Sequence, residues 1–86
     1  MSSEIIESLN DCLNKTITIK LRDKKTVEGK LQDFDQGMNL VLVESKDITS
    51  DDIIILDKII VRGDNIVLVS LPDKSPSFDL KENASN

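Results

Sequence analysis

The chain has 86 residues, of which 38% are hydrophobic and 31% are charged. This length allows one domain, and the composition excludes fibrous and low-complexity classes. There is no histidine and one cysteine, Cys12, which excludes internal disulfides, multi-cysteine zinc sites and histidine-based catalysis. No apolar run approaches the roughly 18–20 residues that span a bilayer, and the acidic start of the chain is unlike a signal peptide. We therefore expect a soluble cytoplasmic protein with no membrane partner, cofactor or metal, and not an enzyme.

The charge balance limits how the chain could bind nucleic acid. Its net charge is −5, which argues against a broad basic surface that coats the phosphate backbone. Phe34 and Phe78 are the only aromatic residues, so the sheet platforms on which many single-strand binders stack bases are missing. Any nucleic acid must therefore bind at a small site where a few hydrogen-bond donors converge.

The hydrophobic periodicity changes near Lys15. Before it, apolar residues recur at intervals of three and four, which predicts a helix over residues 4–12 that ends at Asn14. After it, residues 16–21 and 26–31 alternate polar and apolar side chains. This alternation predicts two strands joined by a tight polar turn.

Gly29 lies in the middle of the second predicted strand, on its apolar side. Glycine weakens a strand unless the strand bends sharply or another backbone comes close, so we expect a strong bend there. The apolar phase then slips by one residue, which predicts a bulge near Gln32 and Asp33.

Three further strands are expected in the second half of the chain. Pro72 ends the last of them, because proline cannot donate to a sheet. The polar remainder, residues 73–86, is expected to be a disordered tail. The predicted strands cover residues 39–44, 53–61 (interrupted at 57–58) and 66–71, the turns cover 35–37 and 62–65, and a polar loop covers 45–51.

These later strands carry apolar residues on both faces. A small sheet with one short helix cannot cover both faces of three such strands. The outer strands also lack the proline and lysine clusters that blunt exposed sheet edges. We therefore expect a small, strongly bent five-strand barrel that oligomerises through its edge strands, with Val67 or Val69 facing a neighbouring chain.

Two short motifs stand out within these elements. The first covers residues 17–44 and contains Gly29 and the turn Phe34-Asp35-Gln36-Gly37-Met38-Asn39-Leu40. The second is Ile60-Val61-Arg62-Gly63-Asp64-Asn65-Ile66-Val67-Leu68. At this separation and behind a helix, the pair resembles the motifs of the Sm and Sm-like (Lsm) protein family, and most of all its archaeal members.

The resemblance implies a mainly β fold, with a short N-terminal helix followed by a five-strand antiparallel SH3-like barrel, the Sm fold. Residues 1–72 would form this domain and residues 73–86 the tail. In the family, the fourth and fifth strands pair between subunits and usually close a seven-membered ring. The implied protein partners are therefore copies of the same chain, as a homo-heptamer, or related Sm-like subunits.

The resemblance also implies single-stranded, U-rich RNA as the ligand, bound at the inner rim of the ring in support of RNA processing or ribonucleoprotein assembly. Asn39 would hydrogen-bond the uracil edge, because its carboxamide offers both a donor and an acceptor. Arg62 would stack on one face of the base, as a guanidinium plane can. Gly63 and Asp64 would shape the second turn of the site, and Asp35 would hold the first.

Gly37 stands where the family usually has a histidine that stacks on the other face of the base. The loss of that contact should weaken binding by on the order of 1–3 kcal/mol per base. Two simpler interpretations stay open: Gly37 only adopts a positive φ in its turn, and Arg62 only forms an ion pair with Asp64 or with a neighbouring subunit. The alternative function is therefore a structural ring or filament scaffold with weak or no base-specific RNA binding.

Overall fold

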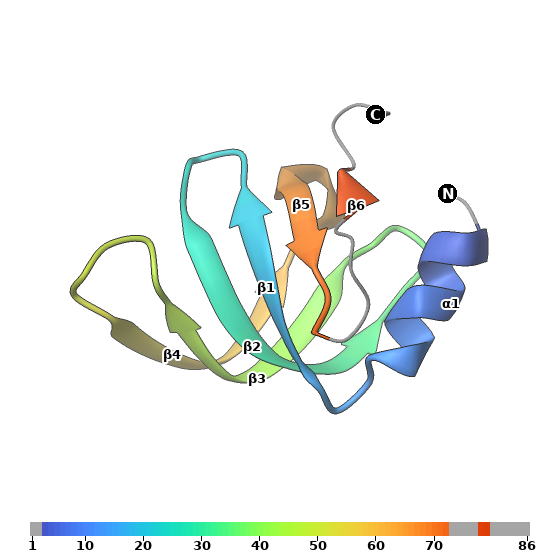
Figure 1. The fold of residues 1–86 in the computed structure, drawn as a ribbon, viewed down its shortest axis with the longest axis horizontal. Helices are drawn as coiled ribbons and strands as arrows, with labels where there is room; N and C mark the ends of the chain where they lie inside the picture. Colours follow the sequence, from blue (N-terminus) through green and yellow to red (C-terminus); the bar gives the residue numbers. More distant parts are fainter. Residues whose placement is uncertain (1–2, 73–77, 80–86) are drawn as a thin grey trace.

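The structure is a computed structural model that describes residues 3–72 and 78–79. One helix precedes a single antiparallel sheet of six strands, in the spatial order β4-β3-β2-β1-β5-β6 (Figure 1). Among the described residues, no helix is long and apolar enough to cross a membrane. The elements are α1 (Ser3–Asp11), β1 (Thr16–Leu21), β2 (Thr26–Phe34), β3 (Leu40–Asp47), β4 (Ile54–Val61), the short 3-10 helix η1 (Gly63–Asn65), β5 (Ile66–Ser70) and β6 (Phe78–Asp79).

The predicted mainly β architecture, a short helix followed by five antiparallel strands, is confirmed. β3 runs further than predicted, because Ser45, expected in a loop, lies in the strand. Its buried hydroxyl donates a hydrogen bond to the backbone oxygen of Asp57 on β4 (2.5 Å), which satisfies the polar group away from water. β6 was not predicted. It falls at residues 78–79 of the expected tail, whose other residues from 73 onward lie outside the described part of the chain.

The sheet bends along a line that crosses three neighbouring strands. On β2, a Cβ added to Gly29 would lie 2.7 Å from the Cβ of Ser45 on β3, closer than two side-chain carbons approach. Glu44 on β3 (φ 51°) and Asp57 on β4 (φ 64°) adopt left-handed backbone, and the pairing of these two strands shifts register there. Figure 1 shows β2 and β3 curving strongly. The predicted bend at Gly29 is thus confirmed, as is the bulge beside Gln32, where β2 shifts register against β3.

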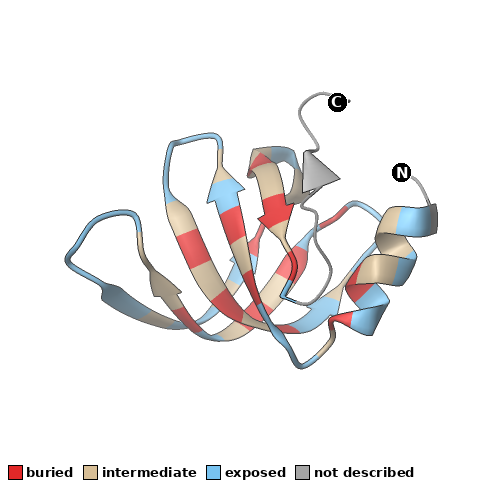
Figure 2. Ribbon diagram, viewed as in Figure 1, coloured by how far each residue is buried: buried red, intermediate tan, exposed pale blue. Residues whose placement is uncertain are grey.

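The core is built by alternate residues of the strands and by one side of α1. Figure 2 shows the buried residues as bands that recur along the strands, as a period of two requires. Of the two candidates for contact with a neighbouring chain, Val69 is 1% exposed and belongs to the core, whereas Val67 is half-buried. The buried hydrophobic residues are Leu9, Cys12, Ile17, Ile19, Val27, Leu31, Met38, Leu40, Leu42, Val61, Ile66, Val69 and Leu71.

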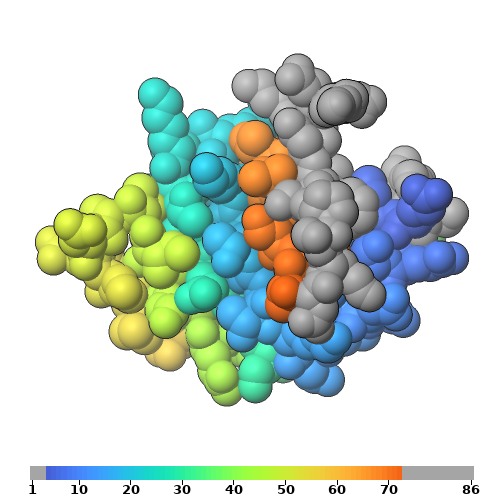
Figure 3. All heavy atoms as spheres, viewed as in Figure 1, coloured from blue at the N-terminus to red at the C-terminus, as the bar shows by residue number. Residues whose placement is uncertain are grey.

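β4 forms one end of the sheet and carries a large exposed apolar surface. Ile53, Ile54, Ile55 and Ile60, on β4 or immediately before it, are each between 55% and 70% exposed. In Figure 3 the end of the molecule that carries β4, in yellow, lies opposite α1, in blue. Single exposed isoleucines are ordinary, but three on one edge strand with a fourth immediately before it indicate a surface that pairs with another chain.

Candidate functional site

The turn between β2 and β3 and the turn between β4 and β5 carry the two sequence motifs, and they lie against each other. The backbone N–H of Gly63 donates a hydrogen bond to Oδ1 of Asn39 (2.8 Å). A Cβ on Gly63 would collide with the carbonyl oxygen of Gly37, so the close approach of the two backbones requires glycine at this position. The fold thus joins Asn39 to the turn that begins at Arg62.

The carboxylate of Asp35 organises the first turn. Its Oδ1 accepts hydrogen bonds from the backbone N–H groups of Gly37 (2.9 Å) and Asn39 (3.0 Å), and its Oδ2 accepts one from Nδ2 of Asn39 (3.0 Å). Hydrogen bonds to the charged form favour it, so the pKa of Asp35 lies below its ordinary value, chiefly because of the bond from the Asn39 side chain.

The left-handed residue of this turn is Met38, with φ 66°, and not Gly37. The expectation of a positive φ at Gly37 was therefore wrong. The Asp35 carboxylate accepts hydrogen bonds from the backbone N–H groups of Gly37 and Asn39, the two neighbours of Met38. Because both N–H groups point to the same carboxylate, the chain reverses at the residue between them. Met38 is 2% exposed and packs into the core, which compensates the strain of its backbone.

The neighbours of Asn39 determine which way its carboxamide faces. The Asp35 carboxylate can only accept a hydrogen bond and the Gly63 backbone N–H can only donate one. Nδ2 must therefore face Asp35, and Oδ1 must face Gly63. One N–H and one oxygen lone pair of this exposed side chain are left for a ligand.

Arg62 and Asn39 line the same open hollow, which has a volume of about 470 Å³. The Arg62 side chain is 76% exposed, and its Nε lies 3.6 Å from Oδ1 of Asp64. The ion pair weighed from the sequence is therefore present, although at this exposure it adds little to stability. The residues that line the hollow are Asp33, Phe34, Asp35, Asn39, Val41, Ile60 and Arg62.

The second turn is also held by Arg22, a residue to which sequence reasoning gave no role. The Arg22 Nε donates a hydrogen bond to the backbone oxygen of Asp64 (2.9 Å). The backbone N–H of Arg22 donates a hydrogen bond to the backbone oxygen of Asn65 (2.8 Å). Arg22 is one of only two arginines in the chain, the one signal that could have drawn attention to it.

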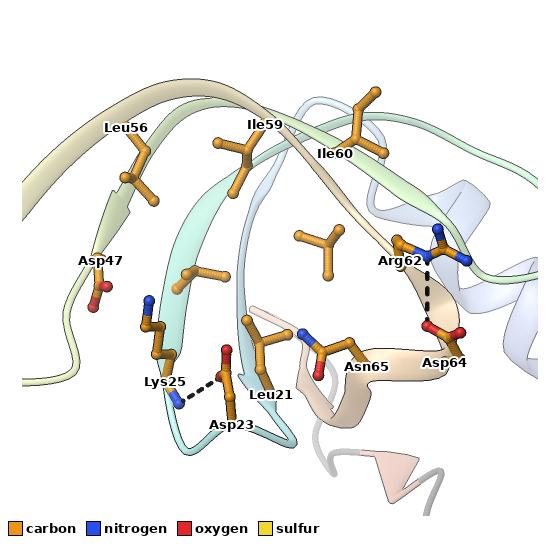
Figure 4. A pocket seen from close by; sticks show the side chains of 12 residues that line it. Leu21, Asp23, Lys25, Asp47, Leu56, Ile59, Ile60, Arg62, Asp64 and Asn65 are labelled. Carbon is orange, nitrogen blue, oxygen red and sulfur yellow. Dashed lines mark hydrogen bonds and ion pairs between the residues drawn. The ribbon is translucent and has the colours of Figure 1, made fainter.

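Figure 4 shows Arg62 and Asp64 at the rim of a second hollow, between β4 and the turn after β1, with apolar side chains such as Leu56 and Ile59 on its wall.

All six residues proposed for the site from the sequence lie in these two adjoining turns. A Cβ on Gly37 would lie at ordinary contact distance from Oδ1 of Asp35 (3.4 Å) and Nδ2 of Asn39 (3.6 Å). A side chain at this position would therefore start beside the Asn39 carboxamide, and glycine leaves that side of the carboxamide uncovered. The six residues are Asp35, Gly37, Asn39, Arg62, Gly63 and Asp64.

The chain is similar to known proteins over most of its length. A family model described as the LSM domain matches residues 7–71. An snRNP Sm-like protein of Methanococcoides burtonii is 35% identical over 71 residues, which make up 81% of this chain and 99% of that protein. A heptameric archaeal Sm protein of known crystal structure superposes with a TM-score of 0.73 at 32% identity, covering 77% of this chain and 97% of that one. The Sm protein of Pyrococcus abyssii, solved in complex with a uridine heptamer, superposes with a TM-score of 0.73 at 25% identity, covering 78% of this chain and 96% of that one.

The match extends from α1 to the end of β5 and includes both of the turns that form the site. The helix and the bent antiparallel sheet are those of the archaeal Sm structures. This chain belongs to the LSM domain family of Sm-like proteins.

Proposed function

We propose that this chain is a non-enzymatic ring subunit that binds single-stranded, U-rich RNA at the inner rim of the ring and supports RNA processing or ribonucleoprotein assembly. Residues 1–72 form the RNA-binding domain, and the ring is built from copies of this chain, as a homo-heptamer. Two relatives support the proposal: one is a heptameric archaeal Sm protein, and the other was solved with a uridine heptamer.

The observation that carries the proposal is the fixed carboxamide of Asn39. Its bonds to Asp35 and Gly63 leave one N–H and one lone pair. Uracil presents a carbonyl acceptor beside the N3–H donor, which complements these two groups. Because the amide is already held in place, little further side-chain entropy is lost when a base binds.

Arg62 supplies the stacking surface beside this amide. Its exposed guanidinium lines the same hollow as Asn39, and Asp64 lies close enough to limit its orientation. A planar guanidinium can stack on a base while it attracts the phosphate backbone. In a ring, the Arg62 guanidinium would recur once per subunit around the rim, beside the carboxylates of Asp35 and Asp64, so its attraction for phosphate would be local to the guanidinium.

The ends of the sheet supply the surface for ring closure. The exposed isoleucines of β4 lie beside its backbone groups, which within the described part of the chain pair only with β3. In the proposed ring, the outer edge of β4 adds to β5 of the next copy by main-chain hydrogen bonds, and the isoleucines become buried.

Fluorescence anisotropy with labelled oligo-U and oligo-A at low salt tests the RNA site. We expect the native chain to prefer oligo-U, and Asn39→Ala and Arg62→Ala each to weaken oligo-U binding by roughly tenfold or more. Gly37→His should tighten binding, because it adds a second stacking surface beside Asn39. Matched controls are Asn10→Ala and Lys20→Ala, which remove an amide and a positive charge from exposed positions that do not line the hollow.

Two results would contradict the proposal. Intact rings that bind neither oligonucleotide would favour the scaffold function instead. An asparagine amide also complements an adenine edge, so oligo-A is a stringent comparison. Equal affinity for oligo-A and oligo-U would contradict the proposed preference for uridine.

A further inference from the structure

The two ends of the sheet differ in how they are covered. At one end, no strand within residues 3–72 and 78–79 pairs with the outer edge of β4. At the other end, β6 pairs antiparallel with β5, with Asp79 opposite Leu68 and Phe78 opposite Val69 (Figure 1). One edge is therefore open, and the other is covered by the chain itself at Leu68 and Val69.

The covered edge is the one that the proposed ring needs. Within its own sheet β5 pairs with β1, so the opposite edge of β5 is the place where β4 of a neighbouring copy would add. A backbone N–H or C=O on that edge can pair with one strand at a time. β6 and the neighbour's β4 therefore compete for the same stretch of β5.

We propose that β6 is a self-capping strand, which closes the β5 edge in the isolated chain and is displaced by β4 of a second copy during assembly. This inference rests on the proposed ring. A covered edge protects a single chain from non-specific strand pairing. Because β6 is tethered to the same chain, it returns to the edge at a high effective concentration whenever the chain is dilute.

The sizes of the two competing strands make the exchange favourable at high protein concentration. β6 has two residues, whereas β4 has eight and brings the exposed Ile54 and Ile55 with it. A neighbour's β4 can therefore form a longer ladder and bury apolar surface. The C-terminal strand thus sets the concentration at which rings form, without preventing their formation.

Native mass spectrometry across a dilution series of the full-length chain tests this proposal. The double substitution Phe78→Pro with Asp79→Pro removes the backbone donors of β6. We expect the concentration at which half of the chains are assembled to fall roughly threefold to tenfold. Ala84→Pro is the matched control, because it adds a proline to the same C-terminal region outside β6, and it should leave this concentration unchanged.

Hydrogen exchange gives a second and independent measurement. The backbone amide of β6 that faces β5 should be protected in the dilute native chain and should lose that protection in the assembled ring. Protection that persists in the ring, or equal assembly of the native and double-proline chains, would overturn the capping role and leave the proposed ring standing. If neither chain assembles at any concentration, the ring itself is wrong, and the capping proposal fails with it.

Discussion

The hydrogen bond between the side chains of Asn39 and Asp35 has a measurable electrostatic consequence. It is the largest of the causes that hold the pKa of Asp35 below the ordinary value of 3.8. The Asn39→Ala variant lacks this bond, so we expect the pKa of Asp35 to rise toward that value. A carbon-13 NMR titration of the aspartate carboxyl groups would measure the change. Asp47 is an internal control, because its pKa is lowered by Thr49 and should not respond.

The same pKa shift gives acid stability a defined sign. Because the pKa of Asp35 is lower in the folded chain than in the unfolded chain, its contribution to stability is fully present above the unfolded pKa. The contribution is lost as the pH falls through the folded pKa. In the Asn39→Ala variant this part of the acid dependence should shrink. An unchanged titration of Asp35 in that variant would contradict the hydrogen-bond network on which the proposed RNA site depends.

The two glycines of the site differ in what they tolerate. A Cβ on Gly63 would collide with the backbone oxygen of Gly37, whereas a Cβ on Gly37 meets its neighbours at ordinary contact distances. We expect Gly63→Ala to lower the free energy of unfolding by about 2–3 kcal/mol, and Gly37→Ala to change it by less than about 0.5 kcal/mol. Urea unfolding monitored by circular dichroism measures both, and equal effects would show that the two turns do not press together.

At the level of residues, the sequence predicted the site residues that lie in a turn within a motif and have a short side chain or none. The motifs indicated Asp35, Asn39 and Gly63, and the structure brings these three into one network. The sequence did not indicate that Met38 would take the left-handed backbone, because that depends on where its side chain finds the core. The role of Arg22 depends on the meeting of two turns that are far apart in the chain, which local patterns do not report.

Among the strands, β5 allows a direct test of which side faces the core. Val69 is buried and Val67 is half-buried. We expect Val69→Lys to lower the free energy of unfolding by about 3–5 kcal/mol, the order of an uncompensated buried charge. Val67→Lys should fold and should instead weaken assembly. Thermal unfolding together with native mass spectrometry separates the two results, and an intact ring in the Val67→Lys variant would show that this side chain does not face a neighbour.

At the level of elements, the strands were predictable wherever one face is buried, since burial on one face imposes a period of two. β1 and β2 show this alternation in sequence and in structure. The extension of β3 was missed because the partner of Ser45 is a backbone oxygen on β4, invisible in the local sequence. β6 was missed for a similar reason: its pairing depends on the edge of β5 and not on any apolar pattern of its own.

For the molecule as a whole, the exposed side of β4 should control RNA affinity from outside the site. Ile55 is 68% exposed and does not line the hollow of Asn39 and Arg62. Ile55→Lys should therefore leave the folded chain and its two turns unchanged, while it charges the surface that a neighbouring copy must bury. We expect native mass spectrometry to show a monomer, and oligo-U affinity to fall by roughly a hundredfold or more, because a single site loses the avidity of the ring.

Thr16→Lys is the control for this whole-molecule effect, because it adds the same charge at an exposed position on β1, away from the edge of β4. The chemical shifts of Asp35 and Asn39 in the Ile55→Lys variant would show whether the site itself is intact. A monomer with those shifts and with native affinity would mean that one pair of turns suffices to bind RNA. The ring would then be dispensable for binding, and the affinity for RNA would come from Asn39 and Arg62 of a single chain.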